Sequence, residues 1–110
     1  MARQNVYAYR INSNEQIATS GTSVQSGTTP FGCNVARLTV HGTSGAPLTF
    51  FSVGRNPTAL TDGSSTYIHE NDQMYISVIP DSSPGAGDGD RFAAICTSGS
   101  SQFFITWLEG

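Results

Sequence analysis

Apolar and polar residues alternate over several short runs of this chain, which is the pattern of β-strands. Successive side chains of a strand point to opposite faces, so a half-buried strand shows a period of two residues. The runs are rich in Val, Ile, Thr, Phe and Tyr, and each is bounded by Gly, Pro, Asn, Asp or Ser. They predict strands at 5–11, 36–41, 48–53, 66–69, 74–80, 91–97 and 102–108, with a shorter candidate at 16–19.

The final run, QFFITWL, is apolar on both of its faces. Phe103, Ile105 and Trp107 share one face of the predicted strand. Phe104 and Leu108 share the other face. We expect the first face to fill the core and the second to pack on a neighbouring chain. The alternative is a strand that is central in its own fold and covered there on both sides.

The segments between the runs are rich in turn residues, and no window favours a helix because serine, threonine and glycine are frequent throughout. Seven or eight short strands separated by turns are typical of a β-sandwich or barrel. We therefore expect an all-β fold, a jelly-roll-like or Greek-key sandwich, in a single domain over residues 1–110. An immunoglobulin-like sandwich fits less well, since Trp107 follows both cysteines instead of lying between them.

The composition narrows the choice of partners. Hydrophobic residues make up 37% of the chain and aromatic residues 10%, which favours a packed core over a disordered chain. There is no lysine, and five scattered arginines in a chain of net charge −3 do not form a nucleic-acid-binding face. The start MARQNVYAYR lacks the apolar run of a secretory signal, and no stretch is long enough for a membrane helix. We expect a soluble protein that is made in the cytosol and binds neither nucleic acid nor membrane.

Two groups of residues suggest redox chemistry or ion binding, and each has a plainer explanation. Cys33 and Cys96 allow one disulfide, but two buried thiols are favoured where no secretory signal is present. Asp81, Asp88 and Asp90 lie in a glycine-rich loop and offer oxygen ligands of the kind that Ca²⁺ prefers. The same residue types are common in solvated hairpin loops, and the spacing of the helix–loop–helix calcium site is absent. We expect no bound metal.

Catalysis has few candidate groups in this sequence. His69 adjoins Glu70 in YIHEND, a pairing that suits acid–base chemistry in a pocket, but the stretch is more typical of a hairpin turn. His41 is the only other histidine, and no serine lies in a G-x-S-x-G elbow. We therefore expect a protein that is not an enzyme and needs no cofactor.

The expected strand edges favour a protein surface as the partner. Lysine commonly guards free sheet edges against unwanted pairing, yet this chain has none, and the runs at 48–53 and 102–108 contain no charge. We therefore expect contact with another protein or with further copies of this chain. The alternative is a carbohydrate-binding or receptor-recognition module, in which exposed rings stack on sugars. The available rings are Trp107, Tyr7, Tyr9, Tyr67 and Tyr75.

A lysine-free, glycine- and serine-rich all-β chain of this size that begins MARQNVYAYRI resembles the capsid decoration proteins of tailed bacteriophages, also called cement or staple proteins. The resemblance covers the size, composition and strand spacing of the whole chain and involves no specific motif. For the short-tailed phages it implies a jelly-roll-like virion protein on the outside of the capsid. Such a protein bridges neighbouring subunits of the major capsid protein and strengthens the head against packaged DNA. The family brings no catalytic residues.

Outward apolar residues and the first strand supply the candidate contacts with a partner. Aromatic and arginine anchors dominate most interfaces, and many copies on one particle gain avidity. A Leu108→Asp change is expected to leave the isolated domain folded and to abolish its association with the particle. The candidate contact residues are Phe104, Leu108, Trp107, Tyr7, Tyr9, Arg3 and Arg10.

Overall fold

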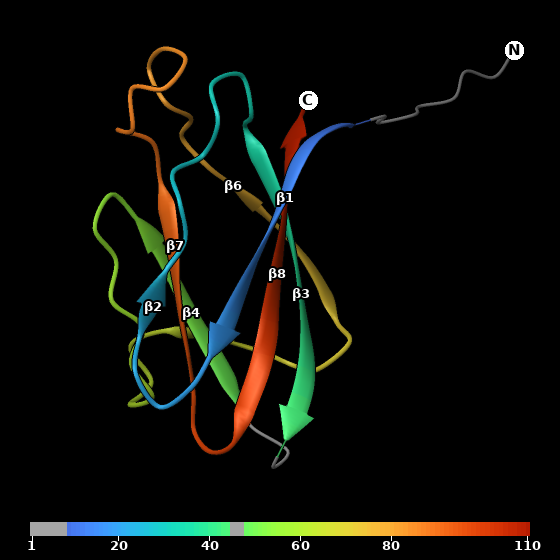
Figure 1. Ribbon diagram of the computed structural model, residues 1–110, viewed down its shortest axis with the longest axis vertical. Coiled ribbons are helices and arrows are strands. Elements are labelled where there is room, and N and C mark those ends of the chain that lie inside the picture. Colours follow the sequence, from blue (N-terminus) through green and yellow to red (C-terminus); the bar gives the residue numbers. More distant parts are fainter. Residues whose placement is uncertain (1–8, 45–47) are drawn as a thin grey trace, which may run out of the picture.

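The computed structural model describes residues 9–44 and 48–110, and their regular structure consists of β-strands. Eight strands form two antiparallel sheets that face each other (Figure 1), which confirms the predicted all-β sandwich. The described part of the chain has no helix that is long and apolar enough to cross a membrane. The strands are β1 (Arg10–Thr19), β2 (Val24–Gln25), β3 (Val35–Ser44), β4 (Thr49–Gly54), β5 (Thr66–Ile68), β6 (Gln73–Ser77), β7 (Arg91–Cys96) and β8 (Ser100–Glu109).

The strand order is nested. Sheet A has the order β1-β8-β3-β6, and sheet B has the order β2-β7-β4-β5. The first strand therefore pairs with the last, β2 with β7, β3 with β6 and β4 with β5. Nested antiparallel pairs distributed over two sheets are the jelly-roll arrangement, the first of the two topologies that the strand pattern predicts.

The first two strands differ most from the prediction. The sequence pattern predicts strands at 5–11 and 16–19, whereas β1 runs without interruption from Arg10 to Thr19. Only Ile17 and Thr19 of this edge strand are buried, so most of β1 has no apolar alternation to reveal it. Residues 5–8 lie outside the described residues. The pattern also misses β2, because a pair of residues is too short to show a period.

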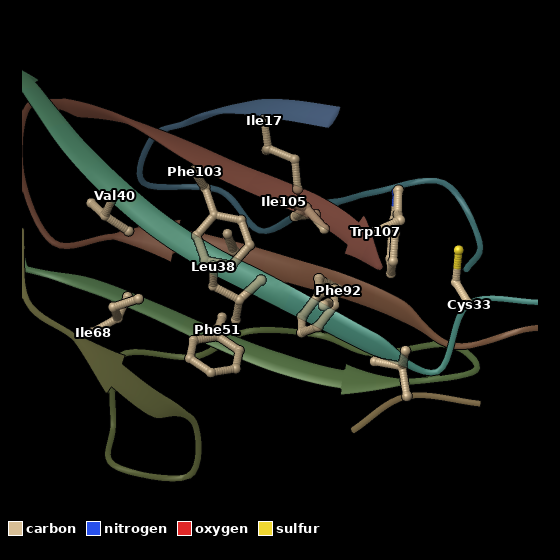
Figure 2. Packing of buried hydrophobic residues seen from close by; sticks show 13 residues of the cluster. Ile17, Cys33, Leu38, Val40, Phe51, Ile68, Phe92, Phe103, Ile105 and Trp107 are labelled. Atoms are coloured by element: carbon tan, nitrogen blue, oxygen red, sulfur yellow. The ribbon is translucent and has the colours of Figure 1, made fainter. Parts of the chain in front are cut away.

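Aromatic side chains fill the space between the sheets (Figure 2). Phe103 and Trp107 of β8 meet Phe51 and Phe92 of sheet B, and the ring centres across the two sheets are 5.8 to 6.2 Å apart. Each of these rings is at most 2% exposed. Burial of one such side chain contributes roughly 1.5–3 kcal/mol, and a favourable ring pair adds about 0.5–1.5 kcal/mol. The core therefore depends on aromatic contacts that join the two sheets.

The two uncharged runs at 48–53 and 102–108 lie in interior strands. β8 lies between β1 and β3, and β4 lies between β7 and β5. β8 is paired with both neighbours along its length, and β4 is paired with β7 along its length and with β5 at Thr49–Phe51. These strands therefore have little need of charge to prevent pairing with another chain. The expectation that the runs at 48–53 and 102–108 leave unguarded sheet surface is therefore wrong. Their lack of charge follows from their central position in the sheets. For the final run this is the alternative stated above, a strand that is central in its own fold.

The loop between β6 and β7 is braced by the aspartates that suggest a calcium site. Oδ1 of Asp81 accepts a hydrogen bond from the backbone N–H of Gly89 over 2.8 Å, and an added Cβ at Gly89 would lie 2.7 Å from the Asp81 backbone nitrogen. Asp88 accepts bonds from the backbone N–H and the hydroxyl of Ser82, which lower the pKa of that carboxyl below its ordinary value. Asp90 also accepts a backbone N–H. Within the described residues no cluster of side chains fits a metal ion.

Candidate functional site

The outer face of sheet A is formed by four paired strands and carries several exposed side chains. Residues on this face line up in rows across the four strands. One row combines Ile11, Leu108, Val35 and Ser77, the next combines Asn14, Thr106, Arg37 and Tyr75, and a third combines Gln16, Phe104, Thr39 and Gln73. The face thus changes from apolar at one end to polar in its middle.

The polar row holds Arg37, which forms no ion pair with the described residues. The Thr106 hydroxyl donates to Oδ1 of Asn14 over 2.8 Å, and the Arg37 guanidinium donates to the Thr106 hydroxyl over 3.4 Å. Arg37 is half-buried, and no described carboxylate lies within ion-pair distance of it. A guanidinium has donors in a planar fork that suits carboxylates. Arg37 is therefore placed to bind a carboxylate of a partner.

Exposed apolar side chains gather at one end of the same face. Ile11 is 57% exposed, Tyr9 42% and Tyr75 52%. The rings of Tyr9 and Tyr75 stack, with their centres 6.0 Å apart and an angle of 24° between their planes. We call Tyr9, Ile11 and Tyr75 the apolar end of sheet A. Aromatic residues and arginine are enriched in protein interfaces, and clustered exposed apolar groups mark binding sites.

The structure corrects the expected exposure of two predicted contact residues. Trp107 points into the core and is 2% exposed, so it is not available to a partner or to a sugar. Leu108 does lie on the outer face, but it is only 3% exposed because Ile11 and Val35 flank it on the neighbouring strands. Phe104, two residues before Thr106 on the same face, is half-buried. Most of the apolar bulk of β8 is therefore covered within the chain.

The remaining predicted contact residues lie near the apolar end or outside the described residues. Tyr9 belongs to the apolar end, and Arg10 is exposed at the start of β1, opposite Glu109. Arg3 and Tyr7 fall outside the described residues. The sequence pattern does not indicate Ile11 or Arg37 as contact residues, and it suggests Tyr75 only as a ring for sugars. The alternation of Ile11, Arg37 and Tyr75 with inward residues predicts that each points outward. Only the strand order shows that the three residues share one face.

The outer face of sheet B is covered in part by the segment 55–60. The Gln25 side chain donates to the carbonyl of Pro57 over 2.8 Å, and the Ser52 hydroxyl donates to the carbonyl of Thr58 over 3.0 Å. Ala59 in the same segment is fully buried. This cover makes the outer face of sheet B a less open surface than that of sheet A.

The histidines lie in exposed positions. Nδ1 of His69 is 3.1 Å from the Tyr67 hydroxyl, and Nδ1 of His41 is 4.0 Å from Oε2 of Glu70. The suggested pair of His69 and Glu70 is thus not formed, and the stretch YIHEND is a turn that leads from sheet B to sheet A, not a hairpin. No pocket is found among residues 9–44 and 48–110.

Both cysteines are buried free thiols, as favoured from the sequence. Cys33 lies at the Trp107 end of the core (Figure 2). Burial, and secondly the charge of Glu109, raise the pKa of the Cys33 thiol. A raised pKa in the folded state means that the stability linked to this thiol is lost as the pH rises through that pKa.

We expect iodoacetamide at pH 8 to react with Cys33 in the folded protein at least about tenfold more slowly than in the urea-unfolded chain, because burial limits both access and the thiolate fraction. Mass spectrometry of the peptide that contains Cys33 measures the rate. A Glu109→Gln change removes one cause of the raised pKa and is expected to increase the rate in the folded protein. Equal rates in the folded and unfolded chains would contradict the burial of Cys33.

No protein-family model matches the chain, and a search of the curated proteins gives no significant match.

Proposed function

We propose that this chain is a non-enzymatic structural protein of a phage virion, which binds the outside of the capsid and bridges neighbouring capsid subunits. The observation that supports a protein-binding role is the outer face of sheet A, where the apolar end lies beside Arg37, which has no ion-pair partner among the described residues. The choice of a phage capsid as partner is based on the resemblance of the whole chain in size, composition and strand spacing.

The apolar end has the composition of an interface anchor. Tyrosine and arginine carry much of the binding energy in many interfaces, and the stacked rings of Tyr9 and Tyr75 are held in place before binding. A partner surface would place apolar side chains over Ile11 and the two rings and a carboxylate against Arg37. Many identical copies on one particle then bind through avidity, without a tight single contact.

We expect an Ile11→Asp change to weaken binding to capsids by at least about tenfold, because it places a charge in the apolar end without disturbing the core. The test is co-sedimentation of the purified protein with heads of the encoding phage from which this protein has been removed. The matched control is Leu60→Asp, since Leu60 is also exposed (44%) but lies in the segment after β4.

Full binding of the Ile11→Asp variant would show that the apolar end is not the contact. A wild-type protein that fails to bind the heads at all would overturn the capsid as partner.

A carbohydrate-binding module is the second candidate, and the same surface supports it. The rings of Tyr9 and Tyr75 are exposed, and Arg37 and Asn14 lie in the polar row beside them. Sugars are commonly held by an aromatic ring with hydrogen-bonding side chains around it. Saturable binding on a glycan array, lost in a Tyr75→Ala variant, would favour this candidate over the capsid protein.

A further inference from the structure

The edges of the two sheets are not equally protected against pairing with another chain. Of the strands at the edges of sheet B, β2 has two residues and β5 has three. β1 at one edge of sheet A contains a bulge between Ile11 and Ser13, and the carboxylate of Glu15 accepts a hydrogen bond from the backbone N–H of Gly27 over 2.7 Å. Short strands, bulges and charges are the usual means of protecting an edge.

The other edge of sheet A, strand β6, has none of these protections. Its sequence, QMYIS, contains neither a charge nor a proline, and its pairing with β3 shows no shift of register. Five residues in regular pairing present a straight row of backbone groups on the side away from β3. β6 is therefore the edge that is best suited to accept a further strand.

The hydrogen bonds of β3 decide which residues of β6 offer free groups. The N–H of Val78 donates to the carbonyl of Asn34 over 3.1 Å, in the same register as the β3–β6 ladder. Hydrogen-bonded pairs alternate along antiparallel strands, so Met74 and Ile76 also face β3. The backbone N–H and C=O groups of Gln73, Tyr75 and Ser77 therefore point outward. None of the hydrogen bonds of the described residues uses these outward groups.

The chain itself limits the free edge at both ends. Beyond Ser77, the N–H of Ile79 donates to Oδ2 of Asp90 over 2.9 Å and the N–H of Asp90 donates to the carbonyl of Ile79 over 2.8 Å. Before Gln73, Asn71 has a φ of 67° and turns the chain away from the strand direction. The open edge thus covers the residues of β6 and no more.

We propose that two copies of this chain associate by antiparallel pairing of their β6 strands around a twofold axis at Tyr75. Gln73 of one copy then faces Ser77 of the other, and Tyr75 faces its own equivalent. Every residue that these pairs bring together offers outward N–H and C=O groups, so the edge is complementary to itself. Sheet A would continue from one copy into the next as one sheet. The length of the open edge favours a second copy of β6 as the added strand. In the second copy the turn at Asn71 ends β6, so the added strand stops before it would meet Asp90 of the first copy.

The side chains of β6 suit this arrangement on both faces. Met74 and Ile76 are half-buried and pack against the core cluster at the side of the sandwich where β6 is the edge strand. In the antiparallel pair each Met74 faces Ile76 of the second copy, which covers this side. On the outer face the Tyr75 rings of the two copies become neighbours. Because β6 carries no charge, no like charges within the strands face each other.

The test is the association constant of the purified full chain, measured by sedimentation equilibrium. We expect the wild-type chain to dimerise and a Ser77→Pro change to raise the dissociation constant by about a hundredfold, because it deletes an outward N–H in each copy and leaves two carbonyls without donors. Proline is tolerated where a strand N–H faces away from the sheet, so the monomer should keep its fold. Ser77→Ala, which keeps the N–H, is the matched control and should dimerise like the wild type.

Amide hydrogen exchange gives a second readout that needs no variant. The amides of Gln73, Tyr75 and Ser77 should become protected as the protein concentration rises, whereas those of Met74 and Ile76 should be protected at every concentration. A wild-type chain that stays monomeric at millimolar concentration would overturn the proposal. So would equal dimer affinities of the Ser77→Pro and Ser77→Ala variants, or protection of the outward amides that does not depend on concentration. The last result would mean that another part of the same chain covers the edge.

This association uses a sheet edge, whereas the proposed function uses the outer face of sheet A. The Ile11→Asp variant should therefore dimerise normally and lose capsid binding. The two proposals can fail separately.

Discussion

Replacing Trp107 with alanine is expected to lower the free energy of unfolding by about 3–5 kcal/mol. Trp107 is 2% exposed and packs against Phe92 of the opposite sheet, with the ring centres 5.8 Å apart. Alanine would leave a cavity between the sheets and would remove one of the ring contacts that join them. A domain of ordinary stability has only about 5–15 kcal/mol in total, so this variant approaches the limit of folding.

Urea denaturation followed by far-ultraviolet circular dichroism measures this loss. Fluorescence is unsuitable because Trp107 is the only tryptophan of the chain. Trp107→Phe serves as the control, since it keeps an aromatic ring in the site and should cost less than the alanine change. A loss below about 1 kcal/mol in Trp107→Ala would be typical of a surface position and would contradict the inward placement of this ring.

Replacing Leu108 with aspartate is expected to destabilise the domain by about 3–5 kcal/mol or to prevent its folding. The side chain is 3% exposed on a central strand, so the change places a carboxylate in a site with little access to water. This expectation replaces the one formed from the sequence, in which the variant keeps its fold and loses only its partner. Leu108→Asp is therefore unsuitable as a test of partner binding.

Ile11→Asp is the matched comparison, because Ile11 lies directly opposite Leu108 on β1 and is 57% exposed. We expect its free energy of unfolding to stay within about 1 kcal/mol of the wild type. Thermal and urea unfolding of both variants measure the difference. Similar losses in the two variants would mean that the exposed fractions do not describe the environments of these residues.

Much of the fold could be predicted from the sequence because most strands have one face in the core. The run at 91–97 shows this, since β7 buries four of its six residues and differs from the prediction by one residue. The ends of β1 could not be predicted in this way, because most of its side chains are exposed. The strand is held instead by its backbone pairing with β8. A period of two residues reveals a strand only where one face is buried. An edge strand that is held mainly by backbone hydrogen bonds buries few side chains and therefore shows little periodicity.

The candidate site could be predicted only in part. Tyr9 and the outward direction of Leu108 follow from alternation alone. Whether an outward side chain is exposed depends on the neighbouring strands, and the sequence does not give their order. That is why Leu108 proves buried while Ile11 and Tyr75, which come from opposite edges of sheet A, form the exposed end.

The nested pairing of strands also has a consequence for how the chain folds. Asn12 donates to Glu109 across 97 positions of sequence, so sheet A cannot close before Glu109 has left the ribosome. Until then β3 and β6 can pair, but the place between β1 and β3 stays empty, and Phe51 and Phe92 of sheet B lack the cover of Phe103 and Trp107. Long-range pairing of this kind makes folding slow. Until β8 inserts, the incomplete core exposes apolar side chains to other chains, which favours aggregation.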